Sequence, residues 1–85
     1  MNPHDFLRKT YRIIIEDENV ETLLCLPSSS QTHGETEIPK NSIVEIKDFL
    51  QILNSIFFVV EYSGKQFFVS DTQVEQFFKR MRIRS

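Results

Sequence analysis

Short runs of apolar residues recur along this chain at spacings that predict strands. Residues 11–16 and 20–26 are rich in β-branched and other apolar side chains. The acidic segment 17–19 between them is typical of a short hairpin loop. We therefore predict a first hairpin over residues 11–26.

A second hairpin is predicted over residues 56–70, where Ser63-Gly64 separates two apolar runs. A two-residue turn at this position sets Val60 opposite Phe67 on one face of the hairpin. The other face holds three more apolar residues, namely Phe57, Val59 and Phe68. We expect one face to line the core, and the other to be covered by another element or to remain open to a partner.

Two short helices are predicted near the ends of the chain. Asn2-Pro3 followed by Asp5 is typical of a helix start, and this helix is expected to end near Lys9. After Ser70, apolar residues follow a helical spacing, namely Val74, Phe77, Phe78 and Met81. A short helix followed by a strand over residues 80–84 fits this last segment equally well.

Residues 42–54 fit two different elements. Ser42 with Glu45 fits a helical capping box, and one helical face would hold Ile43, Ile46, Leu50 and Leu53. However, Ile43-Val44-Glu45-Ile46 is also a good strand sequence. Residues 27–37 contain no large apolar side chain and are predicted to form a flexible, exposed loop. The length of 85 residues indicates a single domain over residues 1–85.

Composition favours a mainly β, globular protein. Eight Phe and two Tyr occur without any Trp, and aromatic and β-branched residues favour strands. No apolar run approaches the roughly 18 residues that cross a bilayer, so no membrane contact is expected. The single Cys25 excludes an intramolecular disulfide, and no apolar run follows Met1 as in a secretory signal. We therefore expect a cytoplasmic location.

Three segments resemble parts of Src-homology-3-like barrels. Residues 64–75 (GKQFFVSDTQVE) resemble the closing hairpin of that family, with a glycine turn, a strand, a short helix and then Val-Glu. Residues 38–46 resemble its other recurrent turn and strand, and residues 57–60 lie where the family has an aromatic pair. The resemblance implies a mainly β, five- to six-stranded barrel of the bacterial type with short N- and C-terminal helices. An α+β fold is the alternative.

The chain departs from that family where the family binds its ligands. Ser70 and Gln73 stand where the family has a ligand-binding Pro and Tyr, and Phe57 lacks an indole N–H. A polyproline groove needs stacked aromatic rings, so we expect no such groove here.

The sequence contains no clear catalytic or metal-binding motif. His4 and His33 have no ligand-spaced partners, and Cys25 lies in an apolar strand without a neighbouring base. Two glycines are too few for a glycine-rich phosphate loop. We therefore expect no enzyme, no metal site and no cofactor.

Two functions remain open. The first is a non-catalytic protein-binding module, meaning an adaptor or a small inhibitor of the kind that mobile elements encode. It would bind an unidentified protein, or a second copy of itself, through an apolar barrel face. Its candidate residues are Phe57, Val59, Phe68, Ser70 and Gln73. The alternative is nucleic-acid binding through a basic C-terminal segment, formed by Lys79, Arg80, Arg82 and Arg84. A net charge of −2 opposes phosphate contact and favours the protein-binding interpretation.

Overall fold

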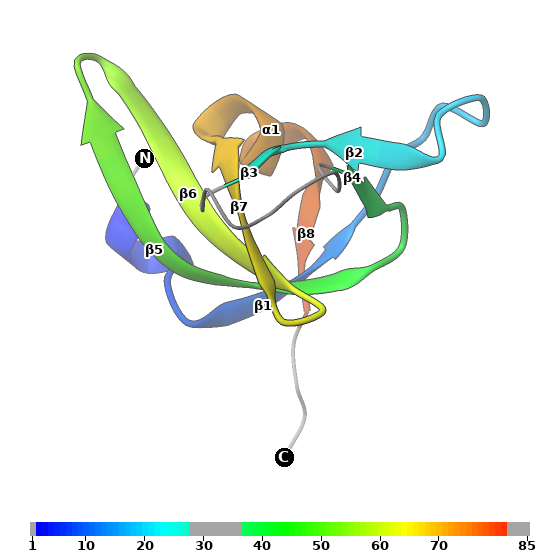
Figure 1. Ribbon diagram of the computed structural model, residues 1–85, viewed down its shortest axis with the longest axis horizontal. Helices are drawn as coiled ribbons and strands as arrows, with labels where there is room; N and C mark the ends of the chain where they lie inside the picture. Colours follow the sequence, from blue (N-terminus) through cyan, green and yellow to red (C-terminus); the bar gives the residue numbers. More distant parts are fainter. Residues whose placement is uncertain (1, 28–36, 82–85) are drawn as a thin grey trace.

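The computed structural model describes residues 2–27 and 37–81, and these residues form a mainly β fold (Figure 1). The mainly β fold class predicted from the sequence is confirmed. The elements in chain order are a 3-10 helix η1 (Pro3–Phe6), β1 (Lys9–Ile13), β2 (Thr22–Leu24), β3 (Leu26–Pro27), β4 (Glu37–Pro39), β5 (Ile43–Ile52), β6 (Ser55–Tyr62), β7 (Lys65–Ser70), α1 (Asp71–Phe77) and β8 (Phe78–Arg80).

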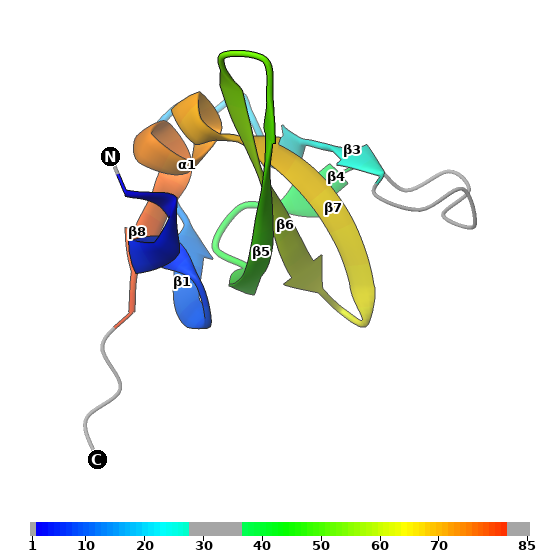
Figure 2. The same ribbon diagram turned by 90° about the vertical axis from the view of Figure 1, so that its left-hand side faces the viewer.

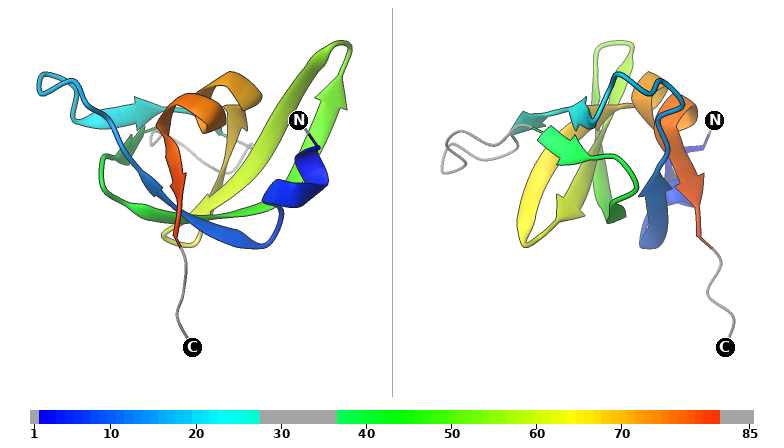
Figure 3. Two further views of the ribbon diagram at one scale, coloured as in Figure 1. Left: turned by 180° about the vertical axis from the view of Figure 1, so that it is seen from behind. Right: turned by 90° about the vertical axis from the view of Figure 1, so that its right-hand side faces the viewer.

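The strands form two antiparallel sheets. The larger sheet has six strands in the order β3-β7-β6-β5-β1-β8, and the smaller sheet pairs β2 with β4. The larger sheet is bent into a trough, and α1 and the β2–β4 sheet lie across its open side (Figures 1 and 3). β3 and β8 are the two edges of the larger sheet, and no pairing joins them among the described residues. The sheet is therefore not closed into a barrel.

The β6–β7 hairpin has the register that its turn predicts. Val60 pairs with Phe67, and the flanking pairs follow in the same register. Ser63 has φ 53° and Gly64 has φ 75°, so both turn residues have a left-handed backbone conformation. A type I′ turn requires this conformation at both positions, and its twist matches that of the paired strands. A Cβ on Gly64 would meet nothing within 4 Å. Backbone conformation, and not lack of space, is therefore the reason for glycine at this position.

The predicted hairpin over residues 11–26 is wrong. β1 pairs with β5 on one side and with β8 on the other, while β2 pairs with β4. Because both edges of β1 are occupied, no edge is left for the segment that follows it. The chain leaves the sheet at Ile14, whose backbone N–H donates to the Phe77 carbonyl at 2.7 Å.

The ambiguous segment 42–54 forms a strand and a turn. β5 spans ten residues, pairs with β1 through its first half and pairs with β6 along most of its length. A bulge between Ile46 and Asp48 shifts the register. Of the predicted loop over residues 27–37, Pro27 ends β3 and Glu37 begins β4, and the residues between them lie outside the described residues.

The core lies between the trough of the large sheet, α1 and the small sheet. Val74 of α1 is 1% exposed and packs with the residues that β6 and β7 turn inward. Phe77 and Phe78 pack against the same core. The fully buried side chains are Phe58, Phe67, Ile13, Ile38, Ile46, Val44, Val60, Val69 and Val74. Among the described residues, α1 therefore covers the inner face of the large sheet and not its outer face.

Both terminal helices are present, and both are shorter than their sequence patterns predict. Asn2 accepts the His4 backbone N–H at 3.1 Å, and η1 ends at Phe6 instead of near Lys9. The Phe6 ring lies 5.3 Å from the Phe58 ring, so η1 closes one end of the core. α1 ends at Phe77 and is followed directly by a strand, but β8 spans Phe78–Arg80 and not the predicted residues 80–84. Met81 is not in a strand, and residues 82–84 lie outside the described residues.

Candidate protein-binding surface

The outer face of the sheet holds the three apolar residues that the sequence singled out. Val59 pairs with Phe68 across β6 and β7. Phe57 lies two residues before Val59 on β6, so its side chain is on the same face. All three are partly exposed, unlike their buried neighbours Phe58 and Val60. The alternation along β6 and β7 thus places one apolar set in the core and another on the outer face.

Side chains from neighbouring strands extend this surface into a groove. Leu50 of β5 pairs with Phe57, and Leu26 of β3 pairs with Phe68. Five apolar side chains line a shallow hollow of about 110 Å³, which we call the outer groove: Leu26, Leu50, Ile52, Phe57 and Phe68. This volume is far below the roughly 300–1,000 Å³ of small-molecule pockets, so it suits single side chains of a protein.

Three residues of the outer groove are unusually exposed for aliphatic side chains. Leu26 is 61% exposed, Ile52 is 54% exposed and Leu50 is 42% exposed. Leu53 follows directly on the chain and is 91% exposed. Contiguous exposed apolar surface of this kind marks binding sites more often than scattered apolar residues do.

Acidic residues border the outer groove on the same face. Asp48 pairs with Val59, and Glu45 pairs with Glu61 further from the groove. Lys47 lies 3.2 Å from the Glu45 carboxylate and offsets part of this charge. Glu45 and Glu61 lie directly opposite each other and repel one another. The same negative charge would repel an acidic group of any molecule that binds in the outer groove.

Ser70 and Gln73, two of the predicted binding residues, form the cap of α1. The Ser70 hydroxyl accepts the Gln73 backbone N–H at 3.2 Å, and the Gln73 side-chain oxygen accepts the Ser70 N–H at 3.2 Å. The Gln73 amide also donates to the Leu24 carbonyl at 3.0 Å. Their polar groups therefore hold α1 against the chain near β2, and neither residue lines the outer groove.

The basic residues of the alternative interpretation lie at the opposite edge of the sheet. Lys79 of β8 pairs with Arg12 of β1, and Arg80 pairs with Tyr11. Burial raises the pKa of the Tyr11 phenol, and the nearby Arg80 guanidinium partly opposes this effect. Within residues 2–27 and 37–81, no carboxylate forms an ion pair with these three basic side chains. Arg82 and Arg84 lie outside the described residues.

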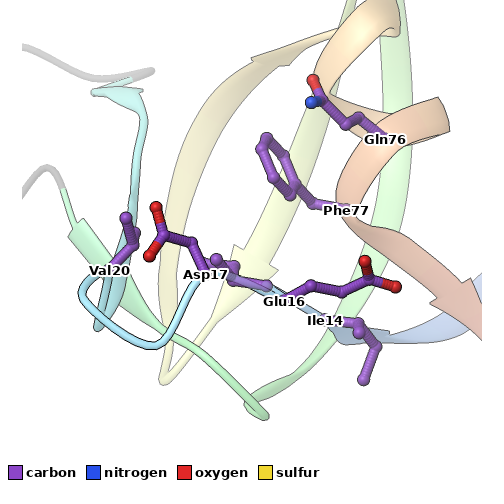
Figure 4. A pocket seen from close by; sticks show the side chains of 7 residues that line it. Ile14, Glu16, Asp17, Val20, Gln76 and Phe77 are labelled. Atoms are coloured by element: carbon purple, nitrogen blue, oxygen red, sulfur yellow. The ribbon is translucent and has the colours of Figure 1, made fainter.

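A larger cleft lies between the loop after β1 and the end of α1 (Figure 4). Its volume is about 440 Å³, and its lining residues are Ile14, Ile15, Glu16, Asp17, Val20, Gln76 and Phe77. The Glu16 and Asp17 carboxylates point in different directions and do not converge on one point (Figure 4). Asp17 accepts the Asn19 backbone N–H at 2.9 Å, which explains its place in the loop.

The described residues offer little to metal or thiol chemistry. Among them, no group of three or more His, Cys, Asp or Glu side chains is placed to hold a metal ion. Burial raises the pKa of the Cys25 thiol to about 11, so this thiol is protonated at neutral pH. His33 lies outside the described part of the chain. In that described part, no helix has the length and apolar character needed to cross a bilayer.

Leu26, Leu50, Ile52 and Leu53 were not predicted to be binding residues, and the sequence placed Leu50 and Leu53 on a possible helical face. The apolar residues at alternating positions 50 and 52 would have indicated Leu50 and Ile52 if residues 42–54 had been assigned to a strand. Leu26 had no such signal, because its position beside Phe68 depends on a pairing between distant parts of the chain.

No protein-family model, no curated protein and no solved structure significantly matches this chain. The resemblance to Src-homology-3-like barrels therefore stays a prediction from the sequence.

Proposed function

We propose that this protein is a non-catalytic protein-binding module, an adaptor or small inhibitor, and that the outer groove receives apolar side chains of its partner. The main support is that four strands bring five apolar side chains together on a face that α1 does not cover. Burying exposed aliphatic side chains against a partner is favourable at about 25 cal/mol per Å² of apolar surface. A cytoplasmic setting, in which thiols stay reduced, suits the free Cys25.

Peptide selection tests this proposal with a closely matched control. The protein is immobilised at low density, so that copies do not meet, and is presented with a displayed peptide library. Ile52→Asp places a charge in the outer groove, whereas Ile43→Asp changes the same residue type on the same strand outside the groove. Ile52 is 54% exposed and Ile43 is 50% exposed, so the two substitutions disturb the fold to a similar extent.

We expect peptides with aromatic or large aliphatic anchors to be enriched on the wild type and on Ile43→Asp, and to be lost on Ile52→Asp. For a selected peptide, Phe57→Ala should weaken binding at least about thirtyfold, as for a buried aromatic anchor. Equal enrichment on all three proteins, or no enrichment on any, would contradict the proposed function.

One observation supports a second candidate, nucleic-acid binding. Arg12 and Lys79 face each other on paired strands, and no carboxylate neutralises them among the described residues. If this pair contacts phosphates, affinity for a single-stranded oligonucleotide should fall steeply with salt and should fall further in an Arg12→Gln/Lys79→Gln variant. Weak, salt-insensitive binding that the double variant retains would exclude this candidate.

A further inference from the structure

The end of the β5–β6 hairpin extends beyond the other strands of the sheet (Figures 1 and 2). β1 pairs with β5 only as far as Ile46, and β7 pairs with β6 only as far as Phe57. The end of this hairpin, residues 50–57, is called the hairpin tip. It is supported by its own two strands and by nearby contacts on the inner side, such as that between His4 and Phe49, whose ring centroids lie 5.0 Å apart.

Residues 49–60 contain no charged side chain, although 26% of the whole chain is charged. This uncharged segment includes most of the outer groove and the turn at its end. A protruding hairpin normally places polar or charged residues on its solvent-facing side, because exposed apolar strands tend to associate with other chains. The hairpin tip thus has the composition of an interface.

Leu53 gives an independent indication at the same place. It is the first of two turn residues, has φ 55° and is 91% exposed. Glycine, Asn and Asp are the common residues at such turn positions because they tolerate a positive φ. The side chains of Asn and Asp are also polar, so their exposure to water costs little. Leu53 has a strained backbone conformation, and the described residues do not bury its side chain. A contact outside the chain would explain why an aliphatic residue is found there.

We propose that a second copy of this chain covers the hairpin tip, so that two copies form a symmetric dimer through residues 50–57, with Leu53 at the turn in the contact. This rests on the proposed function, because Leu50 and Ile52 also line the outer groove. In a two-fold dimer, each patch meets an identical patch, so a patch with a net charge meets another of the same sign. The uncharged tip avoids that repulsion.

The acidic border of the outer face limits how two copies meet. Glu45 and Glu61 lie on the part of β5 and β6 away from the tip, and Asp48, which pairs with Val59, lies between them and Leu50. When two tips overlap in antiparallel orientation about Leu50 and Phe57, the acidic residues of the two copies lie at opposite ends of the interface, away from one another. Apolar side chains of the two tips then meet near Leu50 and Phe57, which pair with each other within each copy.

Sedimentation equilibrium of the full chain tests this dimer with three single variants. We expect the wild type and Ile43→Asp to dimerise, and Ile52→Asp to be monomeric. Leu53→Gly removes the exposed side chain and relieves the positive φ, so it should weaken dimerisation at least tenfold without lowering the melting temperature of the dilute, monomeric protein. Because this variant does not weaken the fold, loss of its dimer reports on the contact itself.

Opposite charges provide the positive test. Leu50→Asp and Leu50→Lys should each be monomeric alone, and an equimolar mixture should recover association because the two Leu50 positions lie near the two-fold axis and face one another. A wild type that stays monomeric up to about 1 mM, a dimer that tolerates both Ile52→Asp and Leu53→Gly, or open-ended association would overturn the proposal. A monomeric wild type that still selects peptides through Ile52 would overturn the dimer and leave the proposed function standing.

Discussion

Replacing Phe67 and Phe68 by alanine, one at a time, separates the two faces of β7. The residues are adjacent and identical in type, but they point to opposite sides of the sheet. Phe67 is 1% exposed and pairs with Val60 in the core. Phe68 is partly exposed and lines the outer groove. Their substitutions therefore remove the same atoms from two different environments.

The expected losses differ by several kcal/mol. Phe67→Ala removes a fully buried ring and leaves a cavity, which typically costs about 3–5 kcal/mol. Phe68→Ala removes a ring that water already reaches and leaves no closed cavity, so about 1 kcal/mol is expected from lost apolar burial. A domain of this length is stable by roughly 4–13 kcal/mol, so Phe67→Ala removes much of the total.

Urea unfolding followed by far-ultraviolet circular dichroism measures both free energies, at a protein concentration low enough to keep the chain monomeric. Thermal unfolding of the same proteins gives a second measurement. Since 1 kcal/mol shifts the melting temperature of a small domain by about 4–8 °C, Phe67→Ala should melt at least roughly 12 °C below the wild type. Phe68→Ala should lose less than half of that. Equal losses would mean that the outer face is buried as deeply as the core, and would refute the argument for an open groove.

Two further predictions concern groups inside the fold. Burial raises the pKa of the Cys25 thiol from 9.0 to about 11, so the unfolded chain loses this proton first and stability falls as pH rises through that interval. The loss should reach about 2–3 kcal/mol in urea titrations and should be missing in Cys25→Ala, and an equal fall in both proteins would contradict it. Ser70→Ala should lower the free energy of unfolding by about 1 kcal/mol, because the Gln73 N–H loses its acceptor. The exposed Ser55→Ala serves as control, and equal effects would show that the cap is unimportant.

The β6–β7 hairpin was predictable because its determinants are local. Ser63-Gly64 specifies a two-residue turn, and a turn of known length sets every pair that follows it. The cap of α1 is likewise built from residues three positions apart. By contrast, β1 is paired on both sides with strands that lie far along the chain. No local pattern indicates which distant strand will pair with it.

The helical alternative for residues 42–54 placed Ile43, Ile46 and Leu50 on one face, but the strand divides them. Ile46 is buried on the inner face, whereas Ile43 and Leu50 are 50% and 42% exposed. A bulge between Ile46 and Asp48 also shifts the alternation along β5. The strand forms nevertheless, because β5 gains backbone hydrogen bonds along both β1 and β6.

The outer groove follows from a shortage of covering elements in a sheet that is apolar on both faces. The described chain supplies one seven-residue helix and one two-stranded sheet to cover the large sheet, and both lie on its inner side (Figures 1 and 3). Phe57 and Phe68 therefore have no covering layer of their own, and Leu50 and Ile52 add to the uncovered area. Polar residues at these positions would avoid exposed apolar surface without disturbing the core, because side chains on the two faces of a strand are independent. The proposed protein partner would supply the layer that covers these apolar residues and the exposed Leu53 beside them.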